Sequence, residues 1–210
     1  MNETKPVDSL NTAAKIISSL FHPIFIPLYG LALIFSTPTI FGYLPFATKK
    51  LLFLIMLINN VVLLCPLMIF LRKRNQILSW EMESLRERML PLFFATMLYA
   101  ATAYIVIRHP ASIFIKTYII GIFFISSSIT VINNWWKISI HAAGAGAITV
   151  LALALSFRMY QVITWPLIAV IVMAGLILAS RLRLGSHSPA QVWVGFLLGF
   201  FELGILYRLV

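Results

Sequence analysis

The stretch LLFLIMLINNVVLLCPLMIFL, residues 51–71, is 21 residues long and contains no charged side chain. A helix needs about 20 predominantly apolar residues to cross the hydrocarbon core of a bilayer. A spanning β-strand would instead alternate apolar and polar residues over about ten positions. The unbroken apolar run therefore predicts a membrane-spanning helix.

Six further apolar runs resemble this one, although the first and the fifth of the seven are short. We expect an all-α protein, a polytopic transmembrane helix bundle of six to seven spans. Residues 1–210 then form a single membrane domain, in which residues 1–19 are a polar N-terminal segment. The expected spans are Leu20–Ser36, Leu51–Leu71, Leu90–Ile107, Ile113–Ile132, His141–Phe157, Val162–Ala179 and Ala190–Leu209.

The composition supports the same class of protein. Hydrophobic residues make up 61% of the chain and charged residues only 10%, against about 25% charged in a soluble domain. The net charge of +10 comes from basic residues in short loops, where they meet lipid headgroups or an anionic substrate. No exposed basic domain is available for a duplex, so we expect no nucleic acid partner. The single cysteine, Cys65, excludes an intrachain disulfide.

Three polar junctions are predicted to share one face of the membrane. The polar loop at 72–89 follows the second span, two further spans lead to 133–141, and two more lead to 180–188. Each pair of crossings returns the chain to the side that it left. Side chains from these three junctions can therefore meet.

The junctions carry the residue types that bind phosphate. The third, SRLRLGSHSPAQ at 180–191, places two arginines and a histidine directly before an apolar helix. Helix N-termini present free backbone N–H groups and a partial positive charge, which suits a phosphate group. The second, KISIH at 137–141, also ends in a histidine at a helix start. The first supplies Arg86 and Arg88 ahead of Pro91.

Two of these elements resemble a known family. At 180–191 the pattern S-R-x5-H-x3-Q resembles the S-R-x5-H-x3-D signature of the type 2 phosphatidic acid phosphatases. Residues 137–141 resemble the P-S-G-H element of that family, and they retain Ser139 and His141. The third element is the most specific of the signatures, and the second is moderately specific.

The first element is weaker. Arg88 and Pro91 resemble the end of the K-x6-R-P element, but Glu81 stands where the lysine is expected. The three elements occur in the order of the family and on one predicted membrane face. The resemblance covers residues 72–205, the phosphatase-like region.

The resemblance implies a metal-independent mechanism. His187 attacks phosphorus and forms a phosphohistidine, while His141 protonates the leaving alkoxide and then activates water. Gln191 takes the place of the acid that orients the nucleophile. The implied phosphate-binding residues are Arg181, Arg88, Ser139, Lys137 and Arg86.

The glutamine is the departure with the clearest chemical consequence. Gln191 can hold the imidazole by a hydrogen bond but cannot stabilise an imidazolium as a carboxylate does. Slower chemistry, a different acid from elsewhere and loss of activity all remain open. The sequence from Ser188 to Gln191 is also an S-x-x-Q capping box with proline at the first helical position. The two roles are compatible.

A metal-dependent site is disfavoured because no acidic residue stands beside His141 or His187, and Mg²⁺ requires carboxylates near the substrate phosphates. We expect no metal and no other cofactor. The acidic residues are Glu3, Asp8, Glu81, Glu83, Glu87 and Glu202.

The distribution of basic residues does not fix the orientation. Ten of the 16 lysines and arginines lie on the predicted site face and six on the other, which by the positive-inside rule puts the site in the cytoplasm. Four of the ten are candidate substrate ligands, however, and without them the two faces are equal. We expect a multi-pass protein of a bacterial cytoplasmic membrane.

Three functions fit these observations. The first is hydrolysis of a lipid phosphate or polyprenyl (di)phosphate, with the lipid chain remaining in the bilayer. The second is a headgroup or phosphoryl transferase that uses the same histidines with an alcohol as acceptor. The third is a catalytically degenerate relative that binds anionic lipids, which the departures at Gln191 and Ile140 motivate.

Overall fold

The computed structural model describes residues 9–78, 82, 84–158 and 164–209, and all regular structure within them is helical. The elements are α1 (Ser9–Leu20), η1 (Pro23–Phe25), α2 (Ile26–Ser36), η2 (Ile40–Tyr43), α3 (Phe46–Leu57), η3 (Ile58–Val62), α4 (Leu64–Lys73), α5 (Leu85–Arg108), α6 (Ile113–Ile132), α7 (Ile140–Arg158), α8 (Thr164–Arg183) and α9 (Pro189–Leu209).

Seven helical segments of the described chain are long and apolar enough to cross a membrane. The predicted all-α bundle is therefore confirmed, and the chain is an integral multi-pass membrane protein. The first two segments are composite, because each joins two helices through a short irregular turn. The segments are Ser9–Ser36, Phe46–Lys73, Leu85–Arg108, Ile113–Ile132, Ile140–Phe157, Thr164–Arg183 and Pro189–Arg208.

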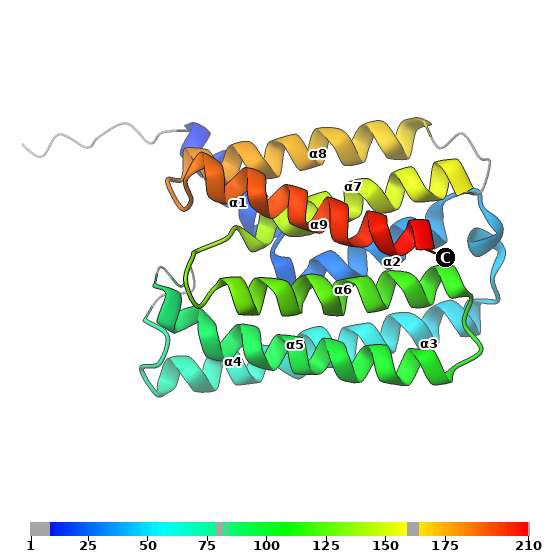
Figure 1. The fold of residues 1–210 in the computed structure, drawn as a ribbon, viewed down its shortest axis with the longest axis horizontal. Coiled ribbons are helices and arrows are strands. Elements are labelled where there is room, and N and C mark those ends of the chain that lie inside the picture. The colour runs from blue at the N-terminus through cyan, green and yellow to red at the C-terminus, as the bar shows by residue number, and fades with distance from the viewer. Residues whose placement is uncertain (1–8, 79–81, 83, 159–163, 210) are drawn as a thin grey trace, which may run out of the picture.

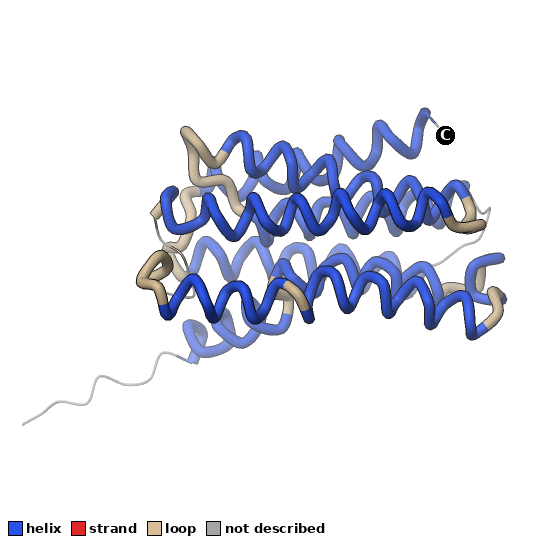
Figure 2. The backbone as a smooth tube through the Cα atoms, turned by 90° about the horizontal axis from the view of Figure 1, so that it is seen from below, coloured by secondary structure: helices blue, strands red, loops and turns tan. Residues whose placement is uncertain are grey.

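The long helices run side by side along one direction (Figures 1 and 2). The start of α5, the start of α7 and the turn between α8 and α9 all lie at the left end in Figure 1. This end is called the site end below. The predicted common face of the three polar junctions is thus confirmed.

The closest helix packing in the bundle joins α7 and α9, and it depends on glycine. A Cβ atom at Gly199 would lie 1.9 Å from the carbonyl oxygen of Ala143, and one at Gly146 would lie 2.0 Å from that of Phe196. Small residues allow backbones to approach in this way where no hydrophobic effect drives helices together. The tight contact fixes the start of α7 beside the start of α9.

The first span begins earlier than expected. Residues 9–19, which the sequence analysis assigns to a polar N-terminal segment, belong largely to α1, and α1 packs along α8. The chain then breaks at His22, where Pro23 begins the short 3-10 helix η1 and Pro27 follows in the first turn of α2. Proline suits these positions because the first N–H groups of a helix have no partner within it.

The second span contains one turn of π-helix, η3. Asn59 lies in this turn and donates from Nδ2 to Thr102 Oγ1 of α5 at 3.0 Å. Asn60 donates to the Met56 sulfur within its own span. A polar group inside a membrane needs such a partner. Asn59 therefore helps to hold the second span against α5.

Candidate active site

The turn between α8 and α9 places His187. Gly185, at φ +62°, ends α8 in the left-handed conformation that favours glycine. Ser188 then starts α9, because its Oγ accepts from the Gln191 N–H at 3.3 Å while Gln191 Oε1 accepts from the Ser188 N–H at 3.1 Å. This reciprocal pair is the predicted capping box.

Gln191 also holds the imidazole of His187. Its Oε1 lies 3.2 Å from His187 Nδ1, and the carbonyl oxygen of Lys137 lies 3.3 Å from the same nitrogen. The Ser188 N–H identifies this atom of the amide as the oxygen, because only an acceptor can face it. Both neighbours of Nδ1 are acceptors, so Nδ1 carries the proton. The lone pair of a neutral His187 is therefore on Nε2.

Burial and nearby cations keep the ring neutral. His187 is 6% exposed. Burial, followed by the charges of Arg88, Arg181 and Lys137, lowers its pKa to about 4, although the hydrogen bond to Gln191 opposes the shift. At neutral pH the side chain is thus an uncharged imidazole with a free Nε2.

The start of α7 is joined directly to that of α9. Ser139 N–H donates to the carbonyl oxygen of Gln191 at 3.2 Å, and a Cβ at Gly195 would lie 2.6 Å from the Ser139 carbonyl oxygen. The hydroxyl of Ser139 is fully buried and accepts from Ala142 N–H at 3.4 Å. In this structure it caps α7, and its predicted contact with phosphate stays a prediction.

The start of α5 supplies Arg88. The apolar run predicts this helix from Leu90, but it begins at Leu85, because Ser84 caps it: Ser84 Oγ accepts from Glu87 N–H at 3.2 Å and donates to Glu87 Oε1 at 3.0 Å. Arg88 consequently lies on the first turn of the helix. Its Nη1 donates to the carbonyl oxygen of Ile138 at 3.0 Å.

Arg88 is poised to bind an anion. The side chain is 4% exposed, and its Nε is buried without a hydrogen-bond partner among the described residues. A buried N–H of a cation that lacks a partner is costly, and an anion arriving at it relieves that cost. Arg86, in contrast, is exposed and does not line the cavity described below.

Helix α1 completes the site through Ser18. Arg181, in the last turn of α8 and 7% exposed, donates from Nη1 to Ser18 Oγ at 3.3 Å. His141 Nε2 lies 3.1 Å from the carbonyl oxygen of Ser18, so Nε2 of that ring carries a proton. The other ring nitrogen of a neutral His141 is then free to accept a proton.

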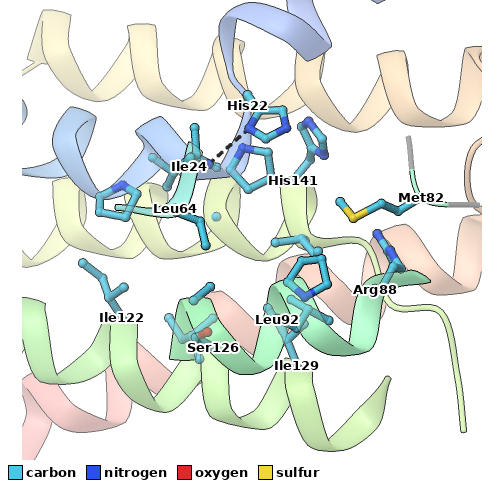
Figure 3. A pocket seen from close by; sticks show the side chains of 18 of the residues that line it. His22, Ile24, Leu64, Met82, Arg88, Leu92, Ile122, Ser126, Ile129 and His141 are labelled. Atoms are coloured by element: carbon cyan, nitrogen blue, oxygen red, sulfur yellow. Dashed lines mark hydrogen bonds between the residues drawn. The ribbon is translucent and has the colours of Figure 1, made fainter. Parts of the chain in front are cut away.

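A cavity of about 430 Å³ opens among these groups. Arg88, Arg181 and His141 all line it. Figure 3 shows His141 and His22 next to each other on one wall and Ser126 on the opposite one. His187 is not a lining residue, but Arg88 and Arg181 lie on the cavity wall and their charges act on its ring.

No protein-family model, curated protein or solved structure matches the chain. The interpretation of the site therefore rests on the residues and their geometry. Within the described residues, no three histidine, cysteine or acidic side chains are grouped so that they could hold a metal ion.

Six of the eight predicted site residues contribute a side chain or a charge to the site, and the side chains of three of them line the cavity wall. Lys137 contributes its backbone carbonyl to His187, and its charge also acts on that ring. The residues brought together are His187, His141, Gln191, Arg181, Arg88 and Lys137.

Two residues were missed from the sequence. His22 caps η1, because its Nδ1 accepts from Ile24 N–H at 3.4 Å. Its ring nevertheless lines the cavity, with its centroid 5.9 Å from that of His141. The His22–Pro23 break in an apolar run was a possible signal for it. Ser18 gave no signal, because its role depends on how α1 packs.

Proposed function

We propose that the chain is a membrane-bound, metal-independent phosphatase that hydrolyses a lipid phosphate or diphosphate through a phosphohistidine. The observation that carries the proposal is the neutral His187, whose protonated Nδ1 is held by two oxygens next to three cationic side chains. A nucleophilic nitrogen and a phosphate-binding set of cations are the two requirements of this chemistry.

In the first half-reaction, His187 Nε2 attacks phosphorus and the bond from phosphorus to the alkoxide oxygen breaks. His141 takes the acidic proton of the bound phosphate on its free ring nitrogen and passes it to that oxygen, so the lipid alcohol leaves neutral. Arg88 and Arg181 lie where they can bind the phosphoryl oxygens on which negative charge spreads. Gln191 keeps the His187 ring in place, and its amide dipole takes the position of a carboxylate.

In the second half-reaction, water attacks the phosphohistidine on the side opposite Nε2. His141, which lost its proton in the first step, accepts one from that water. The N–P bond breaks, inorganic phosphate leaves, and Nε2 regains its lone pair. The departing phosphate takes up the proton held by His141, so both histidines return to their starting states and the net reaction consumes one water.

The test is phosphate release by the purified protein in detergent with a chelator present. We expect turnover of long-chain lipid phosphates or diphosphates and its loss, by at least about 1,000-fold, in His187→Ala. His109→Ala is the matched control, because His109 is exposed and lies after α5, away from the site end. Undiminished release by His187→Ala would rule out the mechanism.

Two further measurements distinguish hydrolysis through a phosphoenzyme from the two alternative functions. Rapid quenching with a radiolabelled substrate should trap a phosphoenzyme that is stable to alkali and labile to acid, and His187→Ala should not form it. Activity that requires an added alcohol would indicate a transferase instead. Absence of turnover by the unaltered protein, with activity appearing in Gln191→Asp, would indicate a degenerate relative.

We further propose a bacterial cytoplasmic membrane as its location, on the resemblance of 180–191 to the lipid phosphatase signature. Fractionation of the producing cell tests this assignment. Recovery in another membrane would contradict the location but not the chemistry.

A further inference from the structure

The cavity continues far beyond the polar groups of the site. At the site end it is lined by Lys15, Arg88, Arg181 and His141, which are basic or can become cationic. Its other walls are mainly apolar and come from η1, α2, α4, α5, α6 and α7. A space with cationic groups at one end and hydrocarbon along the rest matches an anionic headgroup joined to an apolar chain.

The depth of the apolar part of the cavity follows from the positions of its lining residues on α5 and α6. On α6 the lining residues from Ile129 to Tyr118 follow one helix face, and on α5 those from Arg88 to Tyr99 do the same. In each set the first and last residues are 11 positions apart, which is about 16 Å at 1.5 Å per residue. One leaflet of the hydrocarbon core is about 15 Å thick. The cavity therefore extends from the site end to about the middle of the membrane.

Two of the polar side chains at this depth, Ser126 and Tyr118, already have partners. Ser126 Oγ lies 2.7 Å from Thr96 Oγ1, and Tyr118 donates its hydroxyl proton to the carbonyl oxygen of Pro27 at 3.2 Å. These groups do not require a polar ligand. Apolar cavities of this kind exclude water and accept hydrocarbon.

The size of the cavity limits its occupant. A volume of about 430 Å³ lies in the lower part of the range of about 300–1,000 Å³ found for pockets that hold one drug-sized ligand. Two long acyl chains would need more space than this. A single linear or isoprenoid chain fits the long, narrow arrangement of the lining faces.

We infer that the protein binds a single-chain amphiphile with an anionic phosphate headgroup and draws its chain out of the bilayer into this cavity. The inference rests on the proposed function for the headgroup at Arg88 and Arg181. It revises the expectation that the chain stays in lipid, because the cavity offers a protein-lined path of one leaflet in length. Diacyl phosphates would be poor substrates.

The inference is tested by a substitution that fills the apolar part of the cavity and leaves the phosphate-binding residues unchanged. Ala95 lines it on α5, seven residues from Arg88 and thus about 10 Å deeper. Ala95→Phe should lower the affinity for dodecylphosphonate, a non-hydrolysable single-chain probe, by at least about tenfold in nanodiscs. Methylphosphonate binding should not change. Ala101→Phe is the matched control, because Ala101 is on the same helix, exposed and outside the cavity.

Each result separates the two proposals. Equal dodecylphosphonate affinity in Ala95→Phe and Ala101→Phe would overturn the chain-binding site, even if the protein releases phosphate. Chain-dependent binding by a protein that hydrolyses no phosphate ester would overturn the proposed function and leave the chain-binding site standing.

A second measurement needs no variant. Dodecylphosphonate carrying a diazirine on its terminal carbon should crosslink on illumination to the deep lining residues, Tyr99, Tyr118 and Ile122. Labelling confined to exposed, lipid-facing residues such as Phe124 and Phe94 would overturn the inference. The outcome does not depend on whether Ala95→Phe folds.

Discussion

Replacing Gln191 by glutamate tests the electrostatics of the nucleophile most directly. The change keeps the length of the side chain, and S-x-x-E is as good a capping box as S-x-x-Q. The new carboxylate oxygen would stand where Oε1 now lies, 3.2 Å from His187 Nδ1. Helix α9 should therefore start as before, with one negative charge added beside the imidazole.

The expected shift follows from the geometry. Opposite charges about 4 Å apart at an effective dielectric constant of about 20 attract by about 4 kcal/mol. That energy corresponds to about 3 pKa units, and burial of the new carboxylate removes part of it. We expect the pKa of His187 to rise from about 4 to about 6.

The sign of the effect on activity depends on pH. A raised pKa means that His187 loses its nucleophilic lone pair below about pH 6 instead of about pH 4, so the acid limb of kcat/KM should move upward by about two units. Above pH 7 the ring is neutral in both proteins. There the carboxylate stabilises the phosphorylated, positively charged ring, and the rate should increase.

The pKa of His187 also affects how the free energy of unfolding depends on pH. The unfolded chain takes up a proton on this histidine near pH 6.5, whereas the folded protein does so near pH 4. Acidification between these values therefore favours unfolding of the unaltered protein. The Gln191→Glu variant should lose less stability through this group, because its two pKa values are closer together.

The assay is a pH titration followed by NMR with ¹³C-labelled histidine, because the chain has four histidines and single substitutions can assign them. Gln76→Glu is the control, since Gln76 is exposed in the loop after α4 and receives the same charge at a distance. A His187 pKa that stays at its original value or falls in Gln191→Glu would refute the assigned contact.

Three further predictions concern binding and packing. Arg88→Lys keeps the charge but loses the guanidinium fork and the bond to Ile138. It should raise the KM for a phosphorylated lipid by about tenfold or more in steady-state assays. Arg86→Lys, at an exposed position, should leave the KM unchanged. Equal effects of the two substitutions on the KM would contradict the placement of Arg88 in the phosphate site. Gly199→Ala should lower the free energy of unfolding in detergent by about 1–3 kcal/mol, because its Cβ would meet the Ala143 carbonyl oxygen. Gly175→Ala should instead be neutral or stabilising by about 0.5–1 kcal/mol, because nothing lies within 4 Å of its Cβ; destabilisation of both to the same extent would contradict the close packing of α7 and α9.

Two helix starts were predicted wrongly although the sequence contains local signals for them. The S-x-x-E pattern from Ser84 to Glu87 predicts the start of α5 better than the first apolar residue does. The prediction that the helix starts at Leu90 was wrong, because it starts at Leu85. Residues 9–19 look polar, yet α1 needs only a narrow apolar face to pack on α8. The S-x-x-E pattern and the narrow apolar face of α1 are both local features that can be recognised in the sequence.

The membrane-spanning helices and the Ser188–Gln191 cap could be predicted from the sequence, because apolar length and capping are properties of one continuous segment. The common face of the three polar junctions could also be predicted, because it follows from the number of spans between them. The contacts of the Ser18 carbonyl with His141 and of the Lys137 carbonyl with His187, and the apolar cavity below Arg88, could not be predicted in this way. These features arise where helices distant in sequence meet, and their spacing is set by backbone contacts such as that of Gly199 with Ala143.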